Sequence, residues 1–314
     1  MDRSRREFPQ HPAARKVLYF GRFKQILTAM GSARDFSELL TCVTLVAIVG
    51  YITDLQLYAG VCVAIQWLSA IYGIPNQTER YFDLTGSTTY AAASLLAYLV
   101  SDSVSWRDTL LTVFVWLWCV RLGSFLYWRI RECGSDKRFA EIIVDPLCFL
   151  AAWNIQGLWV FFTLLSVLLS ITHGVDDPEV KPLDIIGTSL WLVGYAIEVT
   201  ADCQKTLFRL DQRNEGQFIR SGLWSYSRHP NYFGEIMMWI GVFLVSVHTL
   251  PSFALQCGAA VSPTFMTLLI IFRSGIPLLE EQADERWGKI KAYQEYKKET
   301  SVLVPLPKRK AKAH

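Results

Sequence analysis

Charged residues are scarce in this chain of 314 residues, where Asp, Glu, Lys and Arg make up 19%, below the roughly 25% usual for soluble domains. Neither G-x-G-x-x-G after a strand nor G-x-x-x-x-G-K-[ST] occurs. These absences exclude a soluble nucleotide-binding domain. Hydrophobic residues, by contrast, make up 52% and are clustered into runs. The runs predict an integral membrane protein, in which any dinucleotide would have to bind among the helices.

The usual metal-binding patterns are also missing. The seven cysteines include no C-x-x-C pair, and most of them lie within apolar runs. The five histidines include no H-E-x-x-H motif. The odd cysteine number and these spacings indicate neither a disulfide framework nor a zinc site. We therefore expect small, buried, reduced cysteines and no bound metal.

Basic residues gather at both ends of the chain, with eight Lys or Arg in residues 1–35 and nine in residues 283–314. Such ends are typical of cytoplasmic flanks that face anionic membrane lipids. We expect no nucleic-acid partner, because no basic stripe interleaved with aromatic residues accompanies a soluble fold. The first residues are too polar for a cleavable signal peptide. A mitochondrial presequence stays open, although Asp2, Glu7 and Pro9 argue against it.

Eight hydrophobic segments predict the fold class, an all-α, polytopic membrane bundle of about seven to eight transmembrane helices. The loops at 129–146 and 206–233 are rich in arginine, whereas THGVDDPEVKP has one Lys and the loop at 251–261 has no charge. By the positive-inside rule, both termini are cytoplasmic and a cofactor cavity should open to the cytosol. The segments lie approximately at 37–53, 57–74, 88–103, 109–128, 147–171, 183–205, 234–250 and 262–280.

The last five residues, KAKAH, have lysines at the third and fifth positions from the end. This resembles a cytosolic dilysine signal that returns membrane proteins to the endoplasmic reticulum. We therefore expect the endoplasmic reticulum membrane as the location. A generic basic tail is an equal alternative.

Four ionisable residues, Glu198, Asp202, Lys205 and Arg209, follow one another at spacings of four, three and four. On an α-helix such residues share one face. One interpretation is a self-paired polar stripe against a neighbouring helix. Because Glu198 lies well inside apolar sequence, where ionisable groups are costly, we favour a stripe that lines a hydrated cavity.

A second polar cluster, SRHPNYFGE, opens the next hydrophobic segment. Arg228, Asn231 or Tyr232, and Glu235 again follow the spacing of one helix face. Pro230 suits a first helical turn, so the stretch is predicted to be a loop that enters a helix.

Further arginines, Arg213 and Arg220, precede this cluster. A helix N-terminus with arginines nearby attracts anions, and arginine binds phosphate in a bidentate way. The pattern favours a ligand with a phosphate or carboxylate group at the cytoplasmic face. Interfacial anchoring by Arg, Trp and Tyr is the alternative.

Long motifs carry a family resemblance. The stretches SGLWSYSRHPNYFGE, SPTFMTLLIIFRSGIPLLEEQADERW and KAYQEYKKETSVLVPLP, with VRLGSFLYWRIRECGSDKRF and EVTADCQKTLF, resemble the DUF1295 family. That family is related to the steroid 5-alpha-reductase C-terminal domain, and more distantly to sterol reductases and isoprenylcysteine carboxyl methyltransferases. We accordingly expect a basic N-terminal segment (1–35), two first hydrophobic segments (36–74), a steroid-reductase-like membrane domain (75–306) and a basic tail (307–314).

The resemblance implies a helical membrane reductase that binds NADPH on its cytosolic side. Asn231, Glu235, Asp202, Arg209, Arg121 and Arg129 match positions that bind the cofactor in the steroid reductases. We take His229 as a helix-start residue or phosphate neighbour, not as a base. The full set of predicted cofactor-binding residues is Arg121, Arg129, Glu198, Asp202, Arg209, Arg220, Arg228, His229, Asn231, Tyr232 and Glu235.

The substrate end departs from the steroid reductases, which polarise the substrate ketone with a Glu and a Tyr. By resemblance these positions fall near Asp83 and at Trp118. An indole N–H donates a hydrogen bond but cannot give up a proton as a phenol can, which argues against 3-oxo-steroid reduction specifically. The candidate catalytic residues are Asp83, as acid or orienter, with Tyr90 and Tyr98 as alternative proton donors.

Three functions stay open. The leading one is NADPH-dependent reduction of a carbon–carbon double bond in a lipid or sterol-like molecule, with membrane lipids as the other partners. A methyltransferase of the isoprenylcysteine type, which uses S-adenosylmethionine, is compatible with RHPNYFGE, but EVTADCQKTLF favours the reductases. The third is a non-catalytic membrane scaffold or lipid-binding protein. Trp118 supports it, whereas the costly polar groups at the membrane argue against it.

Overall fold

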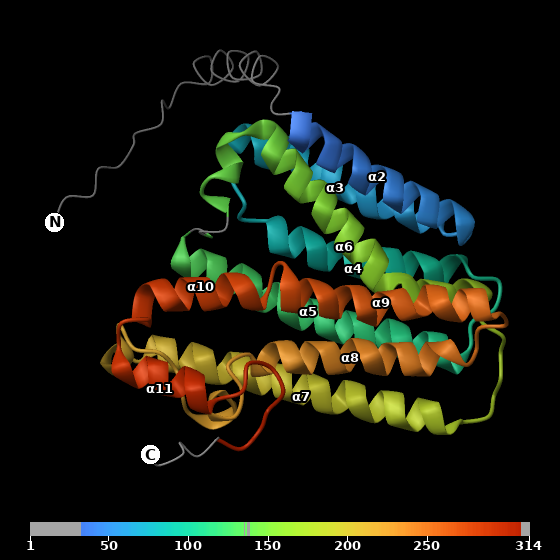
Figure 1. Cartoon of the computed structure of the whole chain (residues 1–314). Coiled ribbons are helices and arrows are strands. Elements are labelled where there is room, and N and C mark those ends of the chain that lie inside the picture. The colour runs from blue at the N-terminus through green and yellow to red at the C-terminus, as the bar shows by residue number, and fades with distance from the viewer. Residues whose placement is uncertain (1–32, 135, 137–138, 309–314) are drawn as a thin grey trace. The chain divides into compact units, whose positions relative to one another are not determined.

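A computed structural model describes residues 33–134, 136 and 139–308, and within them every regular element is helical (Figure 1). Over these ranges the nearest feature to a strand is one isolated parallel bridge between Ser227 and Ser301. The predicted all-α class is confirmed. The α-helices are α2 (Ala33–Ile52), α3 (Gln56–Asn76), α4 (Phe82–Val100), α5 (Trp106–Cys133), α6 (Pro146–His173), α7 (Pro182–Leu210), α8 (Pro230–Val247), α9 (Phe253–Phe272), α10 (Ile276–Trp287) and α11 (Lys291–Glu299), and the short 3-10 turns are η2 (Ile142–Val144), η3 (Gln212–Asn214) and η4 (Gly222–Ser225).

Six stretches of helix are long and apolar enough to cross a membrane, and Phe36–Ile52 is a shorter apolar helix. The chain is therefore an integral membrane protein with about seven apolar helices, as predicted. The predicted segment 88–103 corresponds to α4, which is not one of the six because its first half, FDLTGSTT, is polar. The six are Gln56–Asn76, Trp106–Glu132, Pro146–His173, Pro182–Leu210, Pro230–Val247 and Phe253–Trp287.

The last predicted segment has different boundaries in the structure. The loop expected at 251–261 is mostly helix, because α9 begins at Phe253. The hydroxyl of Ser252 accepts a hydrogen bond from the Leu255 amide (3.3 Å) and so caps the helix start. The helix expected over 262–280 is interrupted, since α9 ends at Phe272 and α10 starts after Gly275. Apolar runs show where a helix is hydrophobic, whereas its ends depend on caps.

The chain forms two compact units, and the division falls within α4, α5 and α6. The first unit comprises residues up to 93 together with 119–161, and the second comprises 94–118 and the residues from 162 onward. In the first unit, α2 and α3 form a hairpin (Figure 1), which turns at Asp54 with φ of 55°. The core of the first unit is aromatic. The ring centroid of Phe82 lies 4.7 Å from that of Trp153 and 4.6 Å from that of Phe139.

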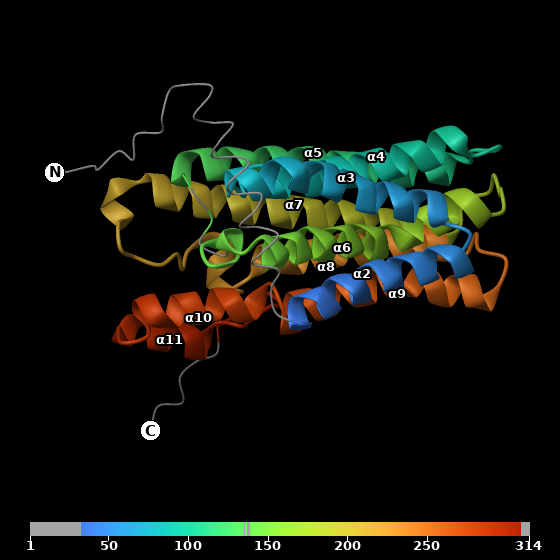
Figure 2. The ribbon, with the colours of Figure 1, turned by 90° about the horizontal axis from the view of Figure 1, so that it is seen from above.

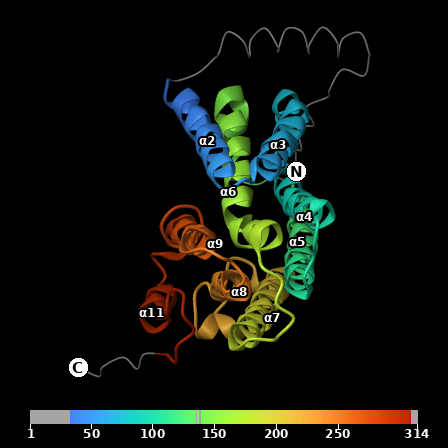
Figure 3. The ribbon, with the colours of Figure 1, turned by 90° about the vertical axis from the view of Figure 1, so that its right-hand side faces the viewer.

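In the second unit, α8 lies between α7 and α9 (Figure 3). The hydroxyl of Ser166 donates to the carbonyl of Ala259 (2.8 Å), which joins the second half of α6 to α9. Beyond α9, α10 and α11 lie side by side (Figure 2). The Lys297 ammonium on α11 contacts the Asp284 carboxylate on α10 at 2.7 Å.

At the opposite end of the second unit, Arg107 clamps the start of α5 to the start of α7. Its side chain is fully buried, and Nε and Nη2 donate to the two carboxylate oxygens of Asp184 at 2.9 and 2.7 Å. It also donates to the carbonyls of Asp177 and Glu179 in the preceding loop. The loop is thus fixed by a buried, fully hydrogen-bonded charge pair.

Three predictions concern positions outside the described residues. They are the basic N-terminal segment as far as residue 32, the cations Lys137 and Arg138 in the loop 129–146, and the tail signal KAKAH. The domain boundaries expected from the resemblance stay predictions.

Candidate functional site

The backbones of α7 and α8 touch through pairs of glycines. A Cβ added to Gly187 would lie 2.6 Å from the carbonyl oxygen of Gly241, and one added to Gly194 would lie 2.5 Å from that of Gly234. The glycines are seven residues apart on each helix, in GTSLWLVG and GEIMMWIG. Small residues let membrane helices approach closely. This heptad spacing is visible in both stretches of the sequence, but it was not among the predicted features of the site.

The close approach places Glu198 of α7 against the first turns of α8. A Cβ on Gly234 would lie 2.9 Å from the Glu198 amide nitrogen and 3.2 Å from its Cβ. Glu198 and Asp202 are buried, with 3% and 7% of their surface exposed. The structure therefore brings these two members of the predicted stripe to the start of α8.

Of the other two members of the stripe, Lys205 is half-buried and Arg209 is exposed. The Lys205 ammonium lies over the Trp224 ring at 4.6 Å, where cation–π attraction stabilises it. The Trp224 indole in turn donates to the carbonyl of Ala201 (3.0 Å), so η4 is held on α7. Arg209 is exposed at the end of α7, and Arg220 is exposed with its guanidinium 5.8 Å from the Phe218 ring.

The start of α8 confirms the prediction of a loop that enters a helix. His229 is the N-cap residue, and Pro230 is the first residue of the helix. The His229 carbonyl accepts the amide of Phe233 (3.2 Å). The His229 and Tyr232 rings stack with centroids 5.8 Å apart. Arg228 precedes the helix, so it does not share the helical face with Asn231 and Glu235.

Glu280 of α10 is the centre of a cluster of charges at this helix start. Its carboxylate contacts Arg228 through Nε (3.1 Å) and Nη2 (3.0 Å). It also contacts His229 Nε2 at 2.9 Å and the Lys297 ammonium at 3.2 Å. The Nη1 of Arg228 donates to the Lys297 carbonyl (2.7 Å), so each nitrogen of this guanidinium already has an acceptor. Arg228 is built in as a clamp between α8, α10 and α11.

The segment after α11 runs beside the residues that precede α8. The Arg228 amide donates to the Ser301 carbonyl (2.8 Å), and the Ser227 hydroxyl donates to the Leu303 carbonyl (2.7 Å). The Leu306 amide donates to the Tyr226 carbonyl (3.2 Å). We call residues 300–306 the C-terminal strap.

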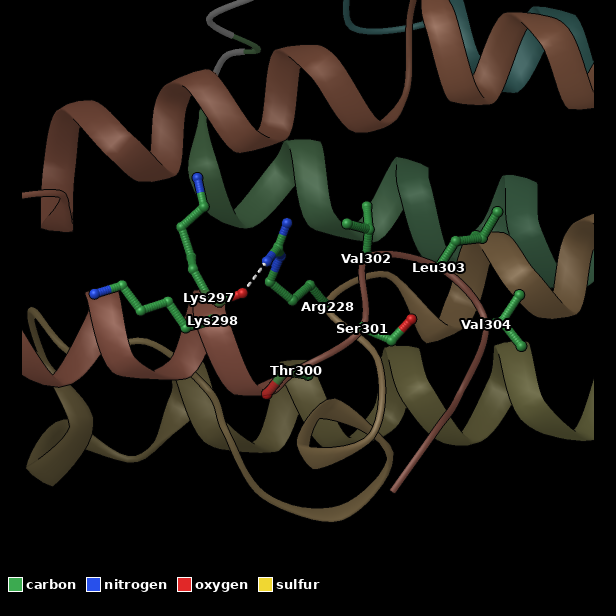
Figure 4. Close-up of a pocket in the computed structure, with 8 residues that line it drawn as sticks. All are labelled: Arg228, Lys297, Lys298, Thr300, Ser301, Val302, Leu303 and Val304. Carbon is green, nitrogen blue, oxygen red and sulfur yellow. Dashed lines mark hydrogen bonds between the residues drawn. The ribbon is translucent and has the colours of Figure 1, made fainter. Parts of the chain in front are cut away.

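A pocket of about 330 Å³ lies between the strap and Arg228 (Figure 4). Arg228 and the two lysines supply positive charge, and the strap supplies an apolar wall. Lys298 is exposed, whereas Lys297 is held by Asp284 and Glu280. Such a pocket suits an anionic group. Its lining residues are Arg228, Lys297, Lys298, Thr300, Ser301, Val302, Leu303 and Val304.

Two buried acceptor atoms at the start of α8 lack a partner within the described part of the chain, namely His229 Nδ1 and Asn231 Oδ1. Burial lowers the pKa of the His229 imidazole below its usual value, although the hydrogen bond to Glu280 acts in the opposite direction. The ring is therefore neutral near pH 7. A carboxylate only accepts hydrogen bonds, so the proton lies on Nε2 and Nδ1 is left as an acceptor. Both atoms call for a ligand that donates hydrogen bonds.

Comparison with known proteins shows which family the chain belongs to. The model of the family described as "Protein of unknown function (DUF1295)" matches residues 71–300. The chain belongs to the DUF1295 family.

This DUF1295 chain is similar to steroid- and sterol-related proteins. It is 32% identical to 3-oxo-5-alpha-steroid 4-dehydrogenase 1 of Macaca fascicularis and 31% identical to that of Homo sapiens, over 42% of this chain and 44% of each relative. It is 25% identical to Delta(14)-sterol reductase of Arabidopsis thaliana, over 52% of this chain and 43% of that protein. The chain thus spans less than half the length of these relatives. No solved structure matches the DUF1295 chain.

Sequence reasoning missed two residues of the site in this DUF1295 chain, Glu280 and Lys297. Glu280 belongs to a run of acidic residues in LLEEQADERW, which suggests only a solvated helix. Its importance depends on α10 folding back toward the start of α8, which no local pattern reveals.

The predicted residues of the first unit form their own arrangement. The carboxylate of Asp83 on α4 lies 3.7 Å from the guanidinium of Arg129 on α5. The Arg121 guanidinium lies 5.8 Å from the Phe125 ring, and Tyr90 is buried. The structure thus brings together Asp83 and Arg129, which were assigned to substrate and cofactor respectively. Their contribution to the reaction stays a prediction.

Two aromatic residues that the sequence connected with the substrate, Trp118 and Tyr98, belong to the second unit. Trp118 packs edge-to-face on Trp239 of α8, with centroids 5.3 Å apart. The Tyr98 hydroxyl is 3.2 Å from the hydroxyl of Thr109, near the start of α5. That is the end held by the Arg107 clamp, about 35–40 Å along α7 from Arg209 by helix rise. The structure does not bring Tyr98 together with the cluster at the start of α8.

Proposed function

We propose that this DUF1295 protein is a membrane-embedded, NADPH-dependent reductase of a carbon–carbon double bond in a lipid or sterol-like substrate. The relatives support the reaction class, because one is named as a steroid dehydrogenase and another as a sterol reductase. The matched part of the chain includes α7, α8 and α10, which form the candidate site.

The observation that carries the proposal is the pair of buried acceptors, His229 Nδ1 and Asn231 Oδ1, beside the cationic pocket. A dinucleotide offers hydroxyl and amide N–H donors for the acceptors and phosphates for the cations. Bound there, NADPH would supply a hydride for one alkene carbon. A protein acid would supply the proton for the other carbon.

The residues of the site divide into binding and positioning roles. Asn231 and His229 accept hydrogen bonds from the cofactor, and Lys298 attracts a phosphate. Arg209 and Arg220, which are exposed, add positive charge near the site. Arg228 acts chiefly by holding the start of α8, because its donors are engaged by Glu280 and Lys297.

Four further predicted residues lie on α7 and α8. Glu198 and Asp202 lie buried on α7 beside the first turns of α8, and Tyr232 and Glu235 belong to those turns. We assign them to the cofactor's ribose and amide groups. Asp83 and Tyr90 are retained as candidates for the acid, whereas the position of Tyr98 makes it the weakest of the three.

The direct test is ligand binding by the full chain purified in detergent. NADPH should raise the unfolding temperature, and S-adenosylmethionine should leave it unchanged. Asn231→Leu should weaken NADPH binding about tenfold or more. It should not lower the stability of the unliganded protein, because the change removes an unsatisfied buried acceptor. Stabilisation by S-adenosylmethionine alone would favour the methyltransferase alternative.

The proposal also includes a location. It places the chain in the endoplasmic reticulum membrane, with both termini and the start of α8 on the cytosolic side. Epitope tags at the two ends should be accessible to antibodies after selective permeabilisation of the plasma membrane. If the tags became accessible only after full permeabilisation, both termini would lie on the side of the membrane opposite to the cytosol.

A further inference from the structure

The first unit contains a polar junction deep in its apolar helices, where α3, α4 and α6 meet. Gln66, at the midpoint of α3, is fully buried. Its amide nitrogen donates to the Thr89 hydroxyl on α4 (2.9 Å), which itself donates to the Thr85 carbonyl (2.7 Å). Because Thr89 has only one hydroxyl proton, it must accept from Gln66. This fixes the orientation of the Gln66 amide and leaves Oε1 as an acceptor.

Helix α6 closes this junction with Gln156 and Gly157. A Cβ on Gly157 would lie 3.2 Å from Cγ of Gln66, so the two helices are in close contact. A Cβ on Gly86 of α4 would lie 2.8 Å from the amide nitrogen of Gln156. Gly86 and Thr89 are three residues apart and share one face of α4. Both glutamine side chains therefore meet α4 on the same face, one turn apart.

Two buried atoms of the junction find no hydrogen-bond partner in the described chain: Gln66 Oε1 and Gln156 Oε1. A buried polar group without a partner destabilises the folded protein. At the depth of a membrane there is no bulk water to offset that cost. Two unsatisfied acceptors complement a hydroxyl group, which donates one hydrogen bond.

We propose that this junction binds the hydroxyl group of an apolar lipid alcohol that enters from the bilayer. A charged headgroup does not suit the site, because the two glutamine oxygens offer no compensating charge. That this lipid is also the substrate of the reductase rests on the proposed function. The hydroxyl-binding site itself does not depend on that function. If they are the same molecule, the substrate is an alcohol whose hydroxyl is held near Tyr90, the residue after Thr89.

Saturable binding of tritiated cholesterol to the purified full chain tests the site, with cholesterol 3-methyl ether as competitor. The ether lacks the hydroxyl proton, so unlabelled cholesterol should compete about tenfold better. Gln66→Met should weaken cholesterol binding about tenfold and remove the difference between the competitors. Gln66→Glu should retain binding, because a buried, protonated carboxyl keeps both a donor for Thr89 and an acceptor.

Controls separate this site from general damage and from the proposed reaction. Asn154→Leu breaks a partly buried hydrogen bond from Trp67 (3.0 Å) in the first unit and should leave cholesterol binding unchanged. Should Gln66→Met fail to fold, Gln156→Met gives the same test. Equal binding by the Met variants and the wild type, or no saturable binding at all, would overturn the proposal, and a bound water would then explain the buried acceptors. NADPH titration of the same variants reports on the cofactor site independently.

Discussion

Gly194 of α7 and Gly234 of α8 meet backbone to backbone, because a methyl group on Gly194 would lie 2.5 Å from the Gly234 carbonyl oxygen. Close packing of this kind is a main source of helix association in membranes, where the hydrophobic effect contributes little. It also places Glu198 directly against the start of α8. The candidate cofactor site therefore depends on two residues without side chains.

Gly194→Ala should destabilise the protein by about 1–3 kcal/mol, since the added methyl forces the two backbones apart. Gly60→Ala on α3 is the matched control, as no described atom lies within 4 Å of the added methyl. Alanine favours helix there, so its effect should be neutral or slightly stabilising. Thermal unfolding in detergent, followed by tryptophan fluorescence, measures both. Equal unfolding temperatures for the two variants would show that the contact is not tight in solution.

Glu280→Gln should lower the stability by about 3 kcal/mol, because Arg228 and Lys297 then keep their charges without a full partner. NADPH affinity should fall as well, since His229 and the start of α8 lose their anchor. Glu281→Gln is the control, because this neighbouring side chain is exposed. Isothermal titration with NADPH and thermal unfolding check the two effects. A Glu280 variant as stable as the control would contradict a central role for this carboxylate.

The pH dependence of stability should include a contribution from His229. Burial lowers the pKa of this ring in the folded state, so the unfolded state binds the additional proton first as the pH falls. The contribution of His229 to the free energy of unfolding is thus fully present above about pH 6.5. It is lost below that pH, by at most about 1.4 kcal/mol per pH unit. His229→Gln keeps a donor for Glu280 but does not titrate. Unfolding temperatures between pH 7.5 and 5.5 should fall more steeply in the wild type, and parallel curves would exclude this origin.

Arg107→Leu should destabilise the second unit by about 3–5 kcal/mol, because it leaves Asp184 buried and unpaired with its main cation. The double variant Arg107→Leu with Asp184→Leu should lose clearly less stability than the single variant Arg107→Leu. Lys181→Met, which breaks partly exposed ion pairs with Asp177 and Glu179, should have little effect on stability. Chemical or thermal unfolding of the three variants gives the comparison. Additive losses in the double variant would contradict strong coupling in the clamp.

Much of the fold followed from the sequence because hydrophobic runs are local signals. The segment predicted at 183–205 lies within α7, and Pro230 begins α8 as expected. The ends were less accurate, as for α9, since Ser252 caps a helix nine residues before the predicted start. The family motif also directed attention to the correct stretch, SRHPNYFGE.

The roles within that stretch could not be read from spacing. Arg228 was expected to face phosphate along with Asn231 and Glu235, but it lies outside the helix and binds Glu280. Glu280 is 52 residues away in the sequence, so its partners depend on how α10 folds back. The orphan acceptor of Gln66 likewise becomes visible only once Thr89 has been placed beside it.

The sequence by itself determined that this is a helical membrane protein with polar residues at the start of a late helix. Composition and periodicity act over a few turns, and these properties need nothing more. Only the tertiary structure decided which polar groups meet, which of them are satisfied and which are left for a ligand. Those outcomes depend on contacts between residues far apart in the chain, such as Gly194 with Gly234 and Arg228 with Glu280.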